Sequence, residues 1–293
     1  MSRIVVKFGG TSVQNSERIK KAAQSIIQQI KKENEVVVVV SAMGDTTDTL
    51  TSLLKDSAKD RIEDKDYADF VSMGERISAR LLSTTIKSMG FSSQYFDPAD
   101  QDFPIITDDD FSQAKILSAE CIKKCQKIID PLLKKGIVPI ICGFLGRSYK
   151  DGSITTLGRG GSDITAFALG NFLEADEVII VTDAVGVLSA DPRIIKEPIT
   201  LKKISVEEMG ILAEGGAKVL HPQALKYKTD KMKAKIIHFQ NGDLSAEGTE
   251  IIGAFKSKLI LFKEKLTMLT LSLIHISEPT RLLSISYAVF CLK

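Results

Sequence analysis

The stretch RIVVKFGGTSVQNSERIKKAAQSIIQQIKKENEVVVVVS, residues 3–41, decides the fold class of this chain. It contains an apolar run, two adjacent glycines, a segment with apolar residues at spacings of three and four, and a second apolar run. A strand, a helix and a strand in this order predict a βαβ unit. Residues 36–40 are all valine, as expected for a central strand that helices cover on both faces. We therefore predict an α/β fold: a three-layer α/β/α sandwich with a mainly parallel sheet.

The same alternation continues along the chain. Further strand-like runs are GIVPIICGF (136–144), EVIIVTDAVGV (177–187) and KAKIIHF (233–239). Polar, glycine-rich loops follow the strand-like runs: FGGTS (8–12), SAMGDTTD (41–48), GRSYKDGSITTLGRGGSD (146–163) and TDAVGVLSADPR (182–193). Ligands of open α/β sheets bind at the carboxyl ends of the strands, so we expect these loops to face one cleft.

Charge and composition favour a small-molecule partner. The 293 residues include 39 Lys and Arg against 37 Asp and Glu, spread evenly along the chain, which argues against a nucleic acid or a membrane surface as partner. We find no leader segment at the N-terminus and no apolar run near the roughly 20 residues that span a bilayer, so we expect a cytoplasmic protein. The four cysteines lack the spacing of a zinc site or a disulfide framework.

The first glycine loop has two interpretations. It has the spacing of neither a P-loop nor a dinucleotide-binding loop. Lys7, the pair Gly9-Gly10 and a helix start near Asn15 could together hold an anion. A tight turn between a strand and a helix, with a lysine at the strand end, explains the same residues.

Three later motifs add groups suited to phosphates and carboxylates. TTLGRGGSD (155–163) combines close-approach glycines with Arg159, which can bind a carboxylate or phosphate through two nitrogens. VTDAVGVLSADPR (181–193) suits a nucleoside, although its Asp-Pro pair could be only a turn. GGAKVLHP (215–222) adds Lys218, while His221 fits a structural cap better than a catalytic base. Lysines and arginines that converge on one cleft are typical of phosphoryl transfer.

Two more groups are ambiguous from the residues alone. Thr47 offers a hydroxyl after the central strand. Glu75 stands at the start of a predicted helix, where it could either compensate the helix dipole or meet a cationic group of a substrate.

Taken together, these motifs resemble those of the aspartate kinases, a branch of the amino-acid kinase family. KFGGTSV, SAMGDTTD, SMGERIS, TTLGRGGSD, TDAVGVLSADPR and GGAKVLHP occur in that family's order over roughly residues 3 to 245. The resemblance implies transfer of the γ-phosphoryl group of MgATP to the β-carboxylate of L-aspartate, with ATP and Mg²⁺ as cofactors. Another small-molecule kinase of this fold, or a ligand-binding regulator without turnover, is the alternative.

The resemblance also assigns residues. Catalytic residues would be Lys7, Asp163 and Lys218. The ATP site would consist of Lys7, Phe8, Gly9, Gly10, Thr182, Asp183, Leu188, Arg193, Lys218 and Val219. The L-aspartate site would consist of Thr47, Glu75, Arg159, Gly160, Gly161 and Ser162. Mg²⁺ would arrive on ATP and not in a protein-built metal site. Some relatives have an aromatic residue at the position of Leu188, so base stacking there is in doubt.

Three segments are expected along the chain. Residues 1–245 would form the catalytic domain and residues 246–270 the start of a truncated ACT regulatory domain, an α+β module. Residues 271–293, LSLIHISEPTRLLSISYAVFCLK, resemble a translated sequencing adapter, with Leu271–Arg281 and Ile285–Leu292 following the adapter codons. The full-length protein would form a homo-oligomer through its ACT domains.

The adapter interpretation can be tested on source DNA. Because a library artefact exists only in the sequenced fragment, amplification of the locus should give a reading frame that departs from this sequence near residue 270. A genomic frame that ends with the same codons would refute the idea.

Overall fold

The computed structural model describes residues 1–58, 61–190, 195–214 and 220–255. In it the predicted βαβ unit is present as strand β1 (Arg3–Phe8), helix α1 (Ser16–Lys31) and strand β2 (Glu35–Val40). The side chain of Asn15 caps α1 by accepting a hydrogen bond from the backbone N–H of Arg18 at 3.0 Å. The apolar stripe of α1 is buried, and β2 is buried along residues 36–40 as its valines predict.

An eight-stranded sheet organises the described residues. Its strands, in spatial order, are β3 (Ser93–Phe96), β5 (Val138–Cys142), β2, β1, β8 (Glu177–Thr182), β10 (Lys233–His238), β11 (Thr249–Ile252) and β9 (Lys203–Ser205). All neighbouring pairs are parallel except β10 and β11. A smaller sheet contains β4 (Ile106–Thr107), β6 (Leu145–Ser148) and β7 (Ile154–Thr156). The prediction of a mainly parallel sheet is confirmed.

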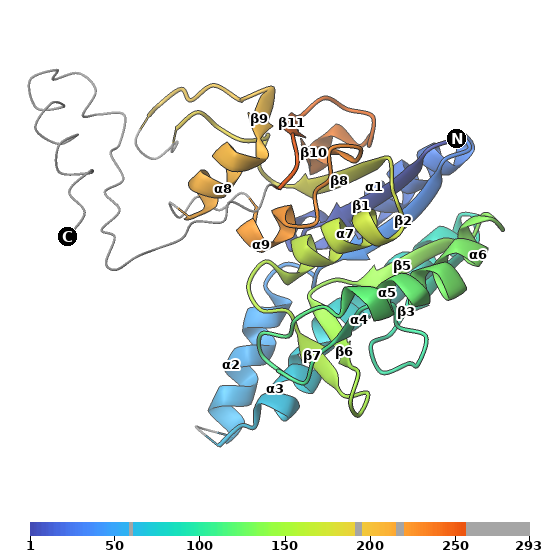
Figure 1. Ribbon diagram of the computed structural model, residues 1–293, viewed down its shortest axis with the longest axis vertical. Coiled ribbons are helices and arrows are strands. Elements are labelled where there is room, and N and C mark those ends of the chain that lie inside the picture. The colour runs from blue at the N-terminus through green and yellow to red at the C-terminus, as the bar shows by residue number, and fades with distance from the viewer. Residues whose placement is uncertain (59–60, 191–194, 215–219, 256–293) are drawn as a thin grey trace, which may run out of the picture. The chain divides into compact units, whose positions relative to one another are not determined.

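Helices cover both faces of the large sheet (Figure 1). Besides α1, the helices of the described residues are α2 (Thr46–Ala58), α3 (Asp64–Val71), α4 (Met73–Ser88), α5 (Ser118–Lys124), α6 (Asp130–Leu133), α7 (Gly161–Phe172), α8 (Val206–Glu214) and α9 (Pro222–Leu225). Of these, α2 and α3 extend away from the large sheet (Figure 1). Single turns form η1 (Gly10–Val13), η2 (Cys125–Ile129, a π-helical turn) and η3 (Phe239–Asn241). α1 packs with α4, whereas α7 packs with α5 and lies over β1 and β8. The layered architecture predicted from the sequence is therefore observed.

Residues 246–255 correct the predicted domain boundary. We expected a second module to begin at residue 246, but β11 lies in the main sheet between β10 and β9. The compact unit extends from Met1 to Phe255. The alternating pattern of this segment reflects a strand that completes the sheet. The remaining residues assigned to the second module and to the tail, 256–293, lie outside the described residues.

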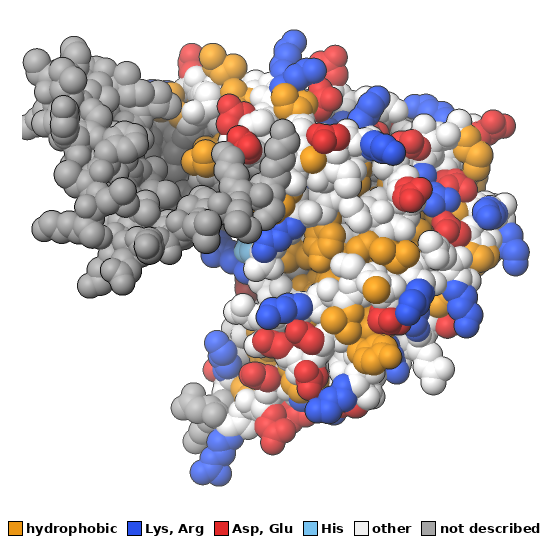
Figure 2. Space-filling model, viewed as in Figure 1, with side chains coloured by type: hydrophobic (Ala, Val, Ile, Leu, Met, Phe, Trp, Pro, Cys, Tyr) orange, Lys and Arg blue, Asp and Glu red, His pale blue; other side chains and the backbone are white. Residues whose placement is uncertain are grey.

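The visible surface agrees with the even distribution of charge. Figure 2 shows acidic and basic side chains interspersed on the face that it displays, without a large patch of one sign. Within the described ranges, no helix has the length and apolarity needed to cross a membrane.

Two helical glycines give a matched test of how closely helices pack on the sheet. At Gly170 of α7, an added Cβ would lie 2.5 Å from Cγ2 of Val178 on β8, whereas at Gly210 of α8 it would meet nothing within 4 Å. Gly170→Ala should therefore destabilise the fold by about 1–3 kcal/mol through overpacking. Gly210→Ala should be neutral or stabilising by up to about 1 kcal/mol through helix propensity. Urea unfolding of both variants measures the difference, and equal effects of one sign would contradict this packing.

Candidate active site

A cavity of about 660 Å³ opens at the carboxyl ends of β1 and β2. It contains side chains or backbone from each of the motifs that follow these strands and from the starts of α2, α4 and α7. Its lining residues are Lys7, Gly10, Ser41, Ala42, Gly44, Thr47, Asp48, Tyr67, Glu75, Ser112, Phe144, Thr156, Gly158, Arg159, Gly160, Gly161, Ser162 and Asp163. Loops that are up to about 150 residues apart in the sequence thus meet here, because the parallel strands end at the same edge.

Lys7 and Asp163 form an ion pair at the floor of this cavity. Nζ of Lys7, near the end of β1, lies 2.7 Å from Oδ1 of Asp163 in the first turn of α7. The two side chains are only 12% and 14% exposed. An ion pair that is this well shielded holds the ammonium group in one position. Both side chains also line the cavity.

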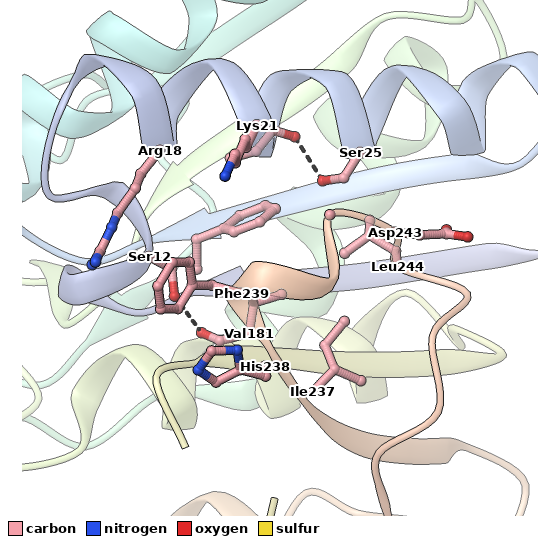
Figure 3. A pocket seen from close by; sticks show the side chains of 13 residues that line it. Ser12, Arg18, Lys21, Ser25, Val181, Ile237, His238, Phe239, Asp243 and Leu244 are labelled. Carbon is pink, nitrogen blue, oxygen red and sulfur yellow. Dashed lines mark hydrogen bonds between the residues drawn. The ribbon is translucent and has the colours of Figure 1, made fainter. Parts of the chain in front are cut away.

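The first glycine turn is fixed against the neighbouring strand β8. The backbone N–H of Gly9 donates to the carbonyl oxygen of Val181 at 3.0 Å, and Oγ of Ser12 donates to the same oxygen at 3.1 Å. Figure 3 shows Ser12 and Val181 in this contact, beside a small cavity of about 20 Å³. Phe8 is 3% exposed and lines that small cavity, not the main one. Any contact of Phe8 with a ligand in the main cavity would therefore use its backbone.

Gly10 allows two loops to touch. The N–H of Gly44 donates to the carbonyl oxygen of Gly10 at 3.0 Å. A Cβ on Gly10 would lie 2.8 Å from the carbonyl oxygen of Ala42. This distance is too short, and the backbone of one of the two loops would have to move to relieve it. A glycine is therefore needed here for close approach rather than for an unusual backbone conformation.

Glu75 is buried with one oxygen unsatisfied. Its Oε1 accepts the N–H of Ala42 at 3.0 Å, whereas Oε2 has no hydrogen-bond partner. The residue is 3% exposed, and burial raises its pKa from 4.5 to about 7 in spite of the opposing hydrogen bond from Ala42. A buried carboxylate with a free oxygen in a cavity is suited to a cationic ligand group, which would lower its pKa again.

The turn from Gly158 to Ser162 presents Arg159 to the cavity. Gly158 and Gly160 have φ values of +70° and +74°, which favour glycine. Arg159 is exposed, and among the described residues it forms no ion pair. The hydroxyl of Ser162 lies close to Gly143, where an added Cβ would be only 2.8 Å from it. The arginine is thus free to bind an anion while the turn that carries it is tightly packed.

The residues predicted for the nucleotide are divided between two regions. Lys7 and Gly10 line the cavity, and Gly9 adjoins Lys7. Thr182 donates to Oδ1 of Asp183 at 3.1 Å just after β8, but neither residue is among those lining this cavity. Leu188 pairs with Thr200 in an isolated bridge, also away from the cavity lining. Arg193, Lys218 and Val219 lie outside the described residues.

The residues predicted for the amino-acid substrate converge. All six of them line the one cavity: Thr47, Glu75, Arg159, Gly160, Gly161 and Ser162. They come from α2, from α4, and from the turn before α7 together with the first residues of α7, which the sequence keeps far apart.

Sequence reasoning missed several lining residues. Tyr67 on α3, Ser112 and Phe144 follow no motif. Phe144 has a φ of +66°, unusual for a bulky residue, and its Cα packs against Gly161. The signal that the sequence offered was its position at the end of the strand-like run 136–144, two residues beyond the observed strand β5.

Comparisons with known proteins identify the family of this chain. A family model described as the amino acid kinase family matches residues 2–238. The chain is 40% identical to an aspartokinase of Geobacillus stearothermophilus over 229 residues, which cover 78% of this chain and 54% of that protein. The chain spans about half the length of the curated relatives it matches.

Solved structures of aspartate kinases have the same fold. The aspartate kinase from Synechocystis superposes with a TM-score of 0.70 at 33% identity, covering 85% of this chain and 40% of that one. Aspartokinase III of E. coli, crystallised in complex with aspartate and ADP, superposes with a TM-score of 0.74 at 26% identity, covering 87% of this chain and 65% of that one. With its family model, its sheet and its glycine loops in agreement, the chain belongs to the amino acid kinase family.

Proposed function

We propose that this chain carries an aspartate kinase activity. It would transfer the γ-phosphoryl group of MgATP to the β-carboxylate of L-aspartate and release 4-phospho-L-aspartate and ADP. This reaction is the first step toward lysine, threonine, methionine and, in bacteria, diaminopimelate. The observation that carries the proposal is the single cavity in which Glu75, Arg159 and Lys7 meet.

The charges of the cavity complement those of L-aspartate. The substrate has one ammonium group and two carboxylates. Glu75 offers a buried oxygen without a hydrogen-bond partner to the ammonium group. Arg159, which forms no ion pair within the part of the chain that the structure describes, offers its guanidinium group to the α-carboxylate. The hydroxyls of Thr47 and Ser162 are neutral hydrogen-bonding groups between them. The similarity to an aspartokinase that binds aspartate and ADP supports this reading.

The chemistry needs positioning and charge neutralisation. A β-carboxylate with an ordinary pKa of about 3.9 is ionised at neutral pH, so it can attack phosphorus without a general base. Lys7, held by Asp163 at 2.7 Å, would reduce the repulsion between the attacking carboxylate and the phosphoryl group. Gly9 and Gly10 would approach the phosphates with their backbone, and Lys218 would add a second cation.

The nucleotide and its metal complete the proposal. Thr182, Asp183, Leu188, Arg193 and Val219 would bind the nucleoside and its phosphates. Mg²⁺ would arrive on the ATP phosphates, as is usual for kinases, which bind this ion through substrate phosphates and one or two carboxylates. When bound, this ion would neutralise phosphate charge.

Coupled measurement of ADP release tests the substrate. L-aspartate should support turnover, whereas N-acetylglutamate, glutamate and UMP should not. Preference for one of the other acceptors would assign the chain to a different kinase of the same fold. Binding without turnover of any acceptor would favour a non-catalytic ligand-binding protein.

Lys7→Ala tests the cationic floor of the cavity. Loss of this ammonium group from a shielded site should reduce kcat/KM for aspartate phosphorylation by about 10²- to 10³-fold. Lys20→Ala, which removes an exposed lysine of α1, should leave turnover within a factor of two. Steady-state kinetics of both variants, with circular dichroism to verify folding, provide the measurement. Near-normal turnover of a folded Lys7→Ala variant would exclude the assigned role.

Glu75→Gln separates binding from stability. The amide preserves an oxygen for the Ala42 N–H but removes the charge, so the KM for aspartate should rise at least tenfold at pH 8. In the free protein, the raised pKa of Glu75 favours its protonated form, so its contribution to stability is present below pH 4.5 and lost as pH rises through about 7. The variant should therefore be more stable than the parent at pH 8, by at most about 3 kcal/mol, and no more stable at pH 4.5.

Thermal unfolding at both pH values measures this difference, and Glu17→Gln on the exposed side of α1 is the matched control. A Glu75→Gln variant that binds aspartate normally would show that this carboxylate does not face the ammonium group.

A further inference from the structure

Helix α9 supports the arginine-bearing turn from behind. Its capping residue, His221, lies against Gly160: a Cβ built on Gly160 would be 2.2 Å from Cβ of His221 and 2.6 Å from its Cγ. Nδ1 of His221 accepts the N–H of Gln223 at 3.4 Å, which orients the side chain at the start of α9. The position of His221 thus limits where Gly160, and with it Arg159, can lie.

The other end of α9 is joined to α7. The side-chain amide of Asn171 donates to the carbonyl oxygen of Tyr227 at 3.1 Å, and the rings of Phe172 and Tyr227 meet edge to face at 5.8 Å. α7 begins at Gly161, directly after Gly160. α9 and the residues that follow it therefore contact both ends of α7: His221 lies at its start and Tyr227 at its end. α9 is therefore a short brace along α7.

Lys228 anchors this brace through an uncommon arrangement. It is only 4% exposed, yet within the described ranges no carboxylate lies at ion-pair distance from it. Its Nζ donates to the carbonyl oxygens of Thr229 at 2.8 Å and Gly253 at 2.9 Å. The N–H of Phe255 donates to the carbonyl oxygen of Lys228 at 3.3 Å. The segment after β11 is thus fastened to the end of α9.

A buried ammonium group is costly when, as here among the described residues, no carboxylate lies at ion-pair distance from it. Burial lowers the pKa of Lys228, because desolvation disfavours its charged form, while the carboxylates of Asp230 and Glu250 act in the opposite direction. An apolar side chain of similar length would avoid the desolvation of the charge. Such a side chain could not donate hydrogen bonds to the two carbonyl groups. It could therefore not connect the segment after β11 to the end of α9.

We propose that Lys228 is a positioning residue for substrate binding: by fastening α9 between β11 and α7, it holds His221 against Gly160 and so fixes the turn that presents Arg159. Lys228 itself does not line the substrate cavity. The kinetic part of this inference rests on the proposed aspartate kinase activity.

The test is Lys228→Met, with Lys231→Met as the matched control. Methionine preserves the length of the apolar stem and removes the donors, while Lys231 is exposed and three residues further along the chain. The proposal predicts that Lys228→Met raises the KM for L-aspartate at least fivefold and changes kcat by less than twofold. A purely structural role would reduce kcat with the folded fraction and leave KM unchanged.

Hydrogen exchange reports on the turn without any turnover. The N–H groups of Asp163 and Ile164 both donate to the carbonyl oxygen of Gly160 at 3.0 Å. In Lys228→Met these two amides should exchange at least tenfold faster relative to amides of β1, and in Lys231→Met they should not change. Unchanged exchange at both amides would overturn the proposal whatever the kinetics show.

A second variant approaches the brace from α7. Asn171→Leu removes the hydrogen bond to Tyr227 and should accelerate exchange at the same two amides. Because both substitutions release one element, the double variant should show less than the product of the single effects. Independent, multiplicative effects would overturn the idea that Lys228 and Asn171 act through α9. If the chain proves not to phosphorylate aspartate, the exchange experiments still decide the brace, so the two failures are distinguishable.

Discussion

The ion pair between Lys7 and Asp163 is the contact on which the arrangement of the site depends. It joins the end of the central strand β1 to the first turn of α7, two elements that are separated by more than 150 residues. Because both side chains are shielded, neither can leave without exposing the other to an uncompensated environment. The pair fixes the glycine turn after β1 and the arginine-bearing turn before α7 relative to each other.

Close backbone packing does the rest of the positioning. Gly10 lets the loop after β1 touch the loop after β2, and Gly161 lets the start of α7 touch Phe144. Glu75 is then held by the Ala42 N–H, so that its second oxygen is left for a ligand. These closely packed loops place a carboxylate, a guanidinium group and an ammonium group around one cavity. A cavity with a few convergent polar groups is typical of a small-molecule site.

Helix α9 and the residues that follow it lie next to the turn that carries Arg159 and limit its movement. The turn that carries Arg159 has two glycines with positive φ and would be mobile if unsupported. His221 lies against Gly160 of this turn, while Tyr227 and Lys228 join the segment after α9 to α7 and to the end of β11. These contacts connect the turn, through α9, to the segment that follows β11.

The sequence by itself determined the fold class and named many of the residues that line the main cavity. Spacings of three and four in residues 16–31 and an unbroken valine run at 36–40 could only be satisfied by covered strands and an amphipathic helix, because burial of apolar surface depends on local periodicity. Only the tertiary structure decided that Phe8 turns away, that Glu75 keeps a free oxygen, that Phe144 joins the cavity and that residues 249–252 complete the sheet. Those outcomes depend on contacts between distant segments, which no local pattern records.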